Sequence, residues 1–569
     1  MTRAGLIAAA CLAITAVPSV AEPLASPIIT DTTGLKASNA LGAIAEDYVK
    51  VTLALGEKEA GYVDAYYGPA KWAEAAKIDP RDMRELGNAL VELMQRLDDL
   101  PKSDDLLIEA RKHFLSAQLE AAVTRHAMIQ GESFSFAKEA KGLFGVTPDL
   151  RPLEEFDPVL EEIENLAPGD GPLSERVAAL EKGYIIPKDR LQIVFDTAIA
   201  ECKARTAKYF DLPEGENFKL EFVTGKSWSG YNYYQGNYQS LIQVNTDLPI
   251  FIGRAVDLGC HEGYPGHHVY NMLLERNLTK GRGWQEFSVY PLYSPQSLIA
   301  EGSANYGIEL AFSGQDRLDY ERDILYPLAG LDPDTAAAYW ALQIAKQALS
   351  GARMTITQRY LDGEITREQA IVLTQKYQLV SRERAEQMTD FAEQYRSYVI
   401  NYGLGMEMVR DWIEAQGDAP VWRWKAMERL LSEPMLPGDL VGVSAEADHS
   451  EAASKIWREF VPDSGQADTV QGELLRSVEK LRDEAIRNGN GNWDEGFEIL
   501  ITYLEEKLLD EPLFEESDRS EIAKILGRLQ KFDNPLMNDE PYDFLVARVV
   551  DYYDFHGSQP RISNPELKR

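Results

Sequence analysis

The stretch Gly259-Cys260-His261-Glu262-Gly263-Tyr264-Pro265-Gly266-His267-His268 decides how the rest of this sequence is interpreted. It holds three of the seven histidines of the chain, and a glutamate directly follows the first of them. Apolar residues at helical spacing flank it on both sides. Imidazoles are common zinc ligands, and a carboxylate beside them can act as general base on water held by the metal. We therefore predict a zinc site on a helical segment.

The spacing of the histidines does not fit a regular helix. On an ideal helix, His267 would lie roughly 9 Å along the axis from His261 and about 120° around it. Ligand nitrogens must lie about 2 Å from the same zinc ion. The backbone must therefore bulge, and Pro265, with glycines on both sides of it, supplies the means. The alternative is a kinked core helix with incidental histidines.

A third, acidic ligand is expected on a neighbouring helix that starts at Ser294-Pro295, a typical cap followed by proline at the first helical position. Glu301 is the candidate because small residues surround it and allow close approach of the histidine helix: Ala300, Gly302, Ser303 and Ala304. Glu309, a little over two turns further on, is a weaker candidate.

The second histidine ligand is His267 or His268. His267 needs the smaller distortion, since each further residue adds about 1.5 Å along the helix. We therefore predict one zinc ion held by His261, His267 and Glu301, with Glu262 as the base. His268 would then be an outer hydrogen-bonding group or a donor to the oxyanion.

These motifs carry a resemblance to a known family. The His261–His268 stretch followed by Glu301-Gly302-Ser303-Ala304-Asn305-Tyr306 resembles bacterial domain-of-unknown-function family 885. That family is grouped with the helical gluzincin metallopeptidases. The resemblance covers about residues 40–435 and implies a mostly helical fold, one zinc ion and peptide-bond hydrolysis. Members often carry an aromatic residue where this chain has Ser303 and a glutamate where it has Ile308.

Charge and the first residues suggest where the protein acts. The net charge of −34 argues against nucleic acid and anionic membranes as partners, because both require basic patches. Residues 1–21 have the pattern of a signal peptide cleaved after Ala21, which predicts a periplasmic or secreted protein. A lipoprotein signal ending at Cys11 is the alternative. No other segment is long and apolar enough to predict membrane insertion.

The periodicity of the chain predicts a mainly α fold with a small antiparallel sheet. Alternation predicts strands at 218–223 and 238–245, joined by a glycine- and aromatic-rich connection. Before and after them, helices are expected at 39–56, 83–100, 104–130, 151–166, 173–184, 188–208, 333–361, 366–380 and 384–413. The predicted organisation is a helical zinc-hydrolase domain at 22–438, a linker at 439–450 and a helical accessory domain at 451–569.

Two further features complete the candidate site. Cys202 and Cys260 could pair in an exported protein, but their spacing does not decide it. Peptide hydrolysis also needs a donor for the developing oxyanion. Tyr398 and Tyr402, one helical turn apart, are candidates, with Tyr402 taken as the catalytic one. Packing is the alternative role for any of the 27 tyrosines.

The function predicted from these observations is zinc-dependent hydrolysis of peptide bonds. Glu262 would take the proton of the attacking water and pass it to the leaving amine. One alternative is a zinc hydrolase of another amide or ester; another is a metal-free helical binding protein. The sequence leaves endo-, amino- and carboxypeptidase modes equally open.

Overall fold

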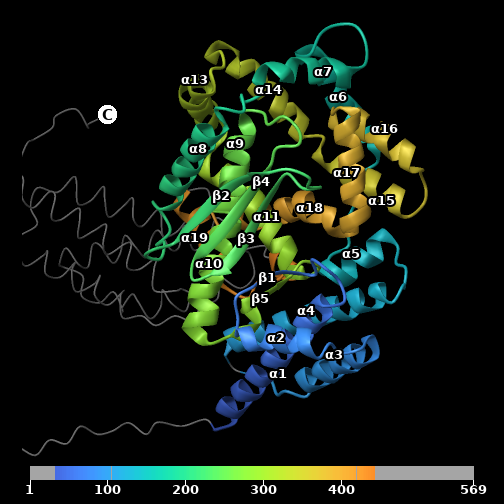
Figure 1. Ribbon diagram of the computed structural model, residues 1–569, viewed down its shortest axis with the longest axis vertical. Helices are drawn as coiled ribbons and strands as arrows, with labels where there is room; N and C mark the ends of the chain where they lie inside the picture. The colour runs from blue at the N-terminus through green and yellow to red at the C-terminus, as the bar shows by residue number, and fades with distance from the viewer. Residues whose placement is uncertain (1–31, 104, 418–419, 442–569) are drawn as a thin grey trace, which may run out of the picture.

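The computed structural model describes residues 32–103, 105–417 and 420–441 (Figure 1). The predicted signal peptide, the part of the predicted linker after residue 441 and the predicted C-terminal domain 451–569 lie outside them. The described chain is mainly helical with small sheets, which confirms the predicted fold class. None of its helices combines the length and the apolar character needed to cross a membrane.

Five helices form the N-terminal end of the fold, at the bottom of Figure 1. They are α1 (Thr32–Gly56), α2 (Ala70–Ile78), α3 (Met83–Asp98), α4 (Leu106–Ile129) and α5 (Phe136–Phe144). Asp82 and Glu85 form a reciprocal capping box at the start of α3. The short helices α2 and α5 were not predicted. A shared apolar core joins this end to the rest of the chain.

A three-stranded sheet crosses the middle of the molecule. Its strands are β2 (Asn217–Val223), β3 (Gly230–Gly236) and β4 (Gln239–Asn245), in the order β2-β4-β3. Asn237 and Tyr238 join β3 to β4 with φ of 52° and 61°, the geometry of a tight hairpin. The two predicted strands are β2 and β4, which pair in parallel, so the antiparallel pairing expected between them was wrong. The antiparallel pair of this sheet is β3 with β4. The predicted connection between two strands contains β3 itself.

Helices before and after this sheet hold the histidine stretch. Before the sheet come α6 (Asp157–Leu166), α7 (Leu173–Glu181) and α8 (Leu191–Thr206). After it come α9 (Gly253–Leu258), a π-helical turn at Gly259–Gly263, α10 (His267–Leu274) and a second π-helical turn at Glu275–Lys280. A two-stranded antiparallel sheet, β1 (Val63–Tyr66) with β5 (Val289–Pro291), precedes α11 (Pro295–Ala311).

The remaining helices close the fold around this centre (Figure 1). They are α12 (Gly314–Tyr320), α13 (Tyr326–Ala329), α14 (Ala336–Gln347), α15 (Ser350–Leu361), α16 (Arg367–Gln378), α17 (Arg382–Tyr395), α18 (Ile400–Glu414) and α19 (Pro420–Ser432). The single helices predicted at 333–361 and 384–413 are each broken in two, so those predictions were wrong.

The break between α17 and α18 has a clear physical cause. Arg396 has a φ of 54°, which an α-helix cannot contain. The buried Glu139 of α5 stabilises it by accepting hydrogen bonds from Arg396 Nε at 2.7 Å and from the backbone amide of Ser397 at 3.0 Å. The chain therefore changes direction just before Tyr398. Sequence periodicity could not reveal this, because the partner lies far away in the chain.

Helices α11 and α18 approach unusually closely. A Cβ atom on Gly302 would lie 2.4 Å from the carbonyl oxygen of Gly405, so only glycine fits there. The small residues around Glu301 were expected to admit the histidine helix, and Gly302 instead admits α18. The histidine stretch contacts α11 at Glu301 itself and again where Gly307 faces Pro265.

A disulfide joins α8 to the π-helical turn. Cys202 and Cys260 are both fully buried, and their Cα atoms lie 5.4 Å apart. The pairing that the sequence left open is therefore present, one residue before His261. This bond fixes the turn to a helix of the central core.

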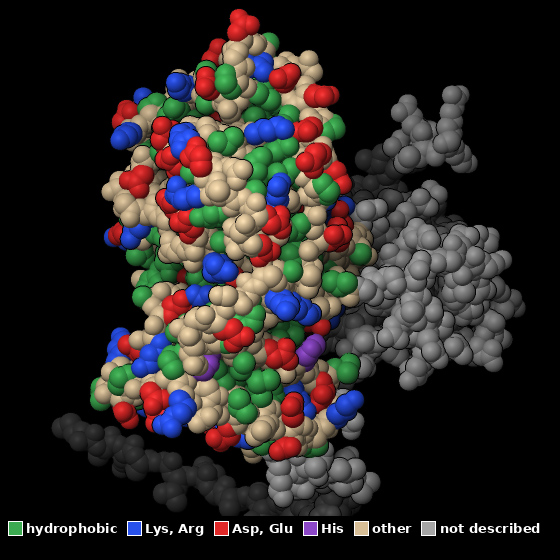
Figure 2. All heavy atoms as spheres, turned by 90° about the vertical axis from the view of Figure 1, so that its right-hand side faces the viewer, with side chains coloured by type: hydrophobic (Ala, Val, Ile, Leu, Met, Phe, Trp, Pro, Cys, Tyr) green, Lys and Arg blue, Asp and Glu red, His purple; other side chains and the backbone are tan. Residues whose placement is uncertain are grey.

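Charged side chains of both signs are mixed on the face of the molecule that Figure 2 draws. Figure 2 shows Lys and Arg side chains scattered among Asp and Glu over the described residues of that face. Such interspersed charge is typical of ordinary solvated surface.

The disulfide generates a stability prediction. The double variant Cys202→Ala/Cys260→Ala should lower the free energy of unfolding by about 4 kcal/mol, because the bond closes a loop of 58 residues. Urea unfolding under non-reducing conditions measures the difference. Dithiothreitol should lower the free energy of unfolding of the wild type but not that of the variant. Equal stability of the two proteins would contradict the prediction.

Candidate metal centre

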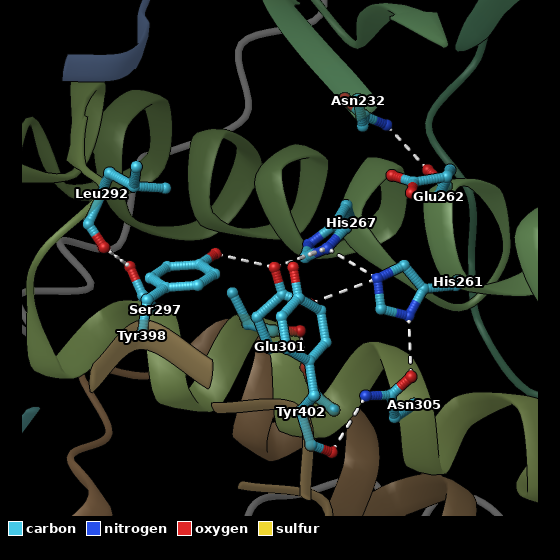
Figure 3. Close-up of polar contacts among 12 residues, drawn as sticks. Asn232, His261, Glu262, His267, Leu292, Ser297, Glu301, Asn305, Tyr398 and Tyr402 are labelled. Atoms are coloured by element: carbon cyan, nitrogen blue, oxygen red, sulfur yellow. Dashed lines mark hydrogen bonds and ion pairs between the residues drawn. The ribbon is translucent and has the colours of Figure 1, made fainter. Parts of the chain in front are cut away.

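Three predicted ligands converge on one point between α10, α11 and the π-helical turn (Figure 3). The Nε2 atoms of His261 and His267 lie 3.2 Å apart. Oxygens of the Glu301 carboxylate lie 3.3 Å from His261 Nε2 and 3.6 Å from His267 Nε2. The structure thus brings together the residues predicted as metal ligands.

The interruption of the helix makes this convergence possible. The π-helical turn ends at Gly263, Tyr264 is extended, and α10 begins again at His267. A Cβ atom on Gly266 would lie 1.8 Å from the carbonyl oxygen of His261, so glycine is required at this position. The bulge that the spacing demanded is therefore built from a wide turn, a break at Pro265 and a glycine.

The hydrogen bonds of Asn305 determine which ring nitrogen of His261 carries the proton. The side-chain amide of Asn305 donates to the carbonyl oxygen of Tyr402 at 3.1 Å. The other atom of that side chain, Oδ1, therefore faces His261 Nδ1 at 3.0 Å and accepts its proton. His261 Nε2 is left with a lone pair directed at His267 and Glu301, which is the form that binds metal.

Charge at the cluster also favours a cation. Burial alone would lower the pKa of His267, but the Glu301 carboxylate raises it to about 9. Burial would raise the pKa of Glu301, yet the two imidazoles hold it well below its usual range. One carboxylate oxygen of Glu301 accepts from the Tyr398 hydroxyl at 2.7 Å, whereas Oε2 is buried without a hydrogen bond among the described residues.

These observations meet the requirements of a zinc ion. Two imidazole nitrogens and one carboxylate are a ligand set typical of catalytic zinc, which keeps a further position for water or substrate. Asn305 and Tyr398 supply the outer hydrogen bonds that orient such ligands. The buried Oε2 of Glu301 is an acceptor that a cation would satisfy.

Glu262 lies beside the cluster in the wall of the same cavity. It is only 4% exposed, and this burial raises the pKa of its carboxyl group. Its backbone carbonyl accepts a hydrogen bond of 2.7 Å from Asn232 of β3 (Figure 3). A Cβ atom on Gly230 would lie 2.6 Å from Glu262 Oε1, so β3 passes close to the carboxylate.

Tyr402 projects from α18 toward the same point. Figure 3 shows its ring beside Glu301, with the hydroxyl directed toward the two histidines. No hydrogen bond to this hydroxyl forms within the described chain, although Tyr398, one turn earlier, is bound to Glu301. Tyr402 thus directs its hydroxyl at the cluster, and Tyr398 holds the Glu301 carboxylate.

The structure does not bring His268 to the cluster, so its predicted role as an outer hydrogen-bonding group of the metal or an oxyanion donor is wrong. Its side chain is fully buried and points away from the cluster. There Nδ1 lies 2.8 Å from Ser240 Oγ and Nε2 lies 2.9 Å from Glu216 Oε2. The physical reason is the rotation of about 100° between successive helical residues. His268 links α10 to the sheet instead.

Glu309 also lies apart from the cluster. It lines the cavity but pairs with Arg410 at 2.9 Å.

Asn305 and Asn232 belong to the site but were not predicted from the sequence. Asn305 lies four residues after Glu301, which places both side chains on one face of α11, and this spacing could have indicated it. Asn232 had no such signal, because β3 was not predicted.

The cluster opens into a cavity of about 1220 Å³. Its walls come from the β1 region, β3, the histidine stretch, α11, α15, α17 and α18. A space of this size can hold several residues of an extended peptide or a small organic substrate.

Comparison with known proteins adds little. No family model matches the chain, and no curated protein matches it. A solved structure described as "putative lipoprotein from Colwellia psychrerythraea" is 16% identical, with a TM-score of 0.39, over 62% of this chain and 65% of that one. The structure described as BsuCP is 13% identical, with a TM-score of 0.33, over 71% of this chain and 90% of that one. Likenesses this low support no conclusion about this chain.

The two neighbouring histidines give a direct test of the centre. His267→Ala should abolish stoichiometric zinc binding, because it removes one of three ligands. His268→Ala should keep zinc but lose roughly 1–3 kcal/mol of stability, because it leaves buried partners unsatisfied. Metal analysis and thermal unfolding of both purified variants measure these effects. Zinc retained in the first and lost in the second would reverse the assignment.

Proposed function

We propose that this protein is a zinc-dependent hydrolase that cleaves peptide bonds. The observation that carries the proposal is the convergence of His261, His267 and Glu301 in a cavity whose wall holds Glu262. A general base next to a three-ligand metal centre with access to substrate is the arrangement that hydrolysis of an amide requires.

The position of β3 favours a peptide as substrate. β3 is an edge strand of its sheet, and its first residues, Gly230, Tyr231 and Asn232, line the cavity. An extended peptide can bind to such an edge through main-chain hydrogen bonds with little dependence on its side chains. A zinc hydrolase of another amide or ester remains the second candidate, and the family resemblance of the histidine and Glu301 motifs favours the peptidase.

Each residue then has a defined task. A zinc ion, when bound, would polarise the scissile carbonyl and activate water. Glu262 accepts the proton of the water as its oxygen bonds to the carbonyl carbon, and Tyr402 donates a hydrogen bond to the oxygen that becomes negative. Glu262 then delivers the proton to the amine nitrogen as the carbon–nitrogen bond breaks. Tyr398 and Asn305 hold Glu301 and His261 in place.

The first experiment is a digest of a peptide library by the zinc-loaded protein, with mass spectrometry of the products. Cleavage at defined bonds, abolished by a chelator and restored by zinc, would support the proposal. Turnover of other amides or esters with no peptide cleaved would favour the second candidate.

The base is tested by substitution. Glu262→Gln should keep stoichiometric zinc and lose turnover by at least about 100-fold, because glutamine cannot accept the proton of water. The matched control is Glu309→Gln, which changes a carboxylate of the same cavity that lies outside the cluster, and it should keep turnover. Near-normal rates in Glu262→Gln would contradict the assignment of the base.

A further inference from the structure

The cavity that holds the candidate metal centre is also lined by arginines from three separate elements. Arg254 comes from α9, Arg353 from α15 and Arg384 from α17. Each is partly buried. The positive charges of Arg254 and Arg353 both lower the pKa of Arg384. We call these three cavity-lining arginines the guanidinium cluster.

Two members of this cluster have no carboxylate partner among the described residues. Arg384 donates to neutral acceptors, Gln387 Oε1 at 2.6 Å and Ser229 Oγ at 3.0 Å. Arg353 lies over the rings of Phe391 and Tyr402, with its Cζ 5.1 Å and 5.8 Å from the ring centres. Arg254 differs, because it pairs with Asp257 at 3.1 Å.

Two other arginines with little exposure in the described chain have carboxylate partners. Arg111 Nη2 lies 3.0 Å from Glu286 Oε2, and Arg317 contacts both Asp257 at 2.7 Å and Glu321 at 2.8 Å. The chain carries 92 acidic residues, so acidic partners are abundant. Burying a charge without a partner is costly. An unpaired pair of guanidiniums facing a cavity therefore indicates that the missing anion belongs to the ligand.

Electrostatics agree with this geometry. Burial, followed by repulsion from Arg254 and Arg353, lowers the pKa of Arg384 to about 10. Burial likewise lowers the pKa of Arg353. A bound anion would remove this repulsion and form charge-assisted hydrogen bonds with the forked donors of both groups.

The cluster lies near the reacting groups. Arg384 contacts Ser229, the residue before Gly230, and Gly230 lies against the Glu262 carboxylate. Arg353 lies over Tyr402, the proposed oxyanion donor. An anion at the guanidiniums would thus lie in the same cavity as the proposed base and the proposed oxyanion donor.

We propose that Arg353 and Arg384 bind the terminal carboxylate of a peptide, so that the protein removes residues from the C-terminal end of its substrates. This inference rests on the proposed peptidase function and makes it more specific. A carboxylate on an acidic side chain has the same chemistry, and the test below distinguishes the two sources.

The test compares three probes: N-acetylated tetra-alanine as the free acid, the same peptide as its C-terminal amide, and the amide with Asp as its last residue. Binding is measured by calorimetry on zinc-loaded Glu262→Gln protein, and cleavage on the wild type. The free acid should bind and be cleaved about 10- to 100-fold better than either amide, since it alone offers charge-assisted hydrogen bonds at the terminus.

Substitutions test whether the preference for the free acid depends on these two arginines. Arg384→Met and Arg353→Met should each remove most of the preference for the free acid while keeping zinc and the thermal midpoint. Arg410→Met is the matched control, because Arg410 lines the same cavity but pairs with Glu309, and it should leave the preference unchanged.

The outcomes separate this inference from the proposed function. Peptides cleaved equally well as acids and amides would overturn the inference and leave the peptidase proposal standing. Preference for the Asp-containing amide would assign the arginines to an acidic side chain and overturn the terminal assignment. If the wild type cleaves no peptide, the peptidase proposal fails. The inference is then decided by calorimetry alone, and it is overturned if the acid and the amide bind equally or not at all.

Discussion

Two imidazoles six residues apart can face one point only where the helix between them is interrupted, and the candidate metal centre depends on that interruption. The π-helical turn, the break at Pro265 and the restart at His267 together replace what would be two turns of helix. Gly266 allows the backbone to pass against the carbonyl of His261. The disulfide at Cys260 anchors the start of the turn. The unusual backbone is therefore supported by ordinary packing on both sides.

The second support is the contact between α11 and α18. Because Gly302 and Gly405 let the two helices approach closely, Tyr398 reaches Glu301 and the backbone of Tyr402 reaches Asn305. The helix pair thus positions the acidic ligand and the amide that fixes the imidazole tautomer, and the turn just before α18 supplies the orienting hydroxyl. The break before Tyr398, stabilised by Glu139, sets the angle at which α18 enters the centre.

Local features of the sequence predicted the fold class, the three converging side chains and the bulge, because each follows from residue spacing and composition over a few turns. Features that depend on distant partners were not predicted. The break at Arg396 needs Glu139, and the parallel pairing of β2 with β4 needs the hairpin that contains β3. His268 shows the same limit: spacing separated it from His267, but its partners Ser240 and Glu216 lie in distant segments and were not predicted.

The disulfide between Cys202 and Cys260 also encloses a segment of the chain. All three strands of the central sheet lie between the two cysteines, so β2, β3 and β4 form part of one covalent ring with the start of the histidine turn. A single cut by a protease anywhere in that ring would open it without releasing a fragment. The strand edge along the cavity and the turn that carries His261 would still be joined by the disulfide after such a cut. The region can therefore survive cleavage of its backbone, a benefit distinct from the contribution of the disulfide to the free energy of unfolding.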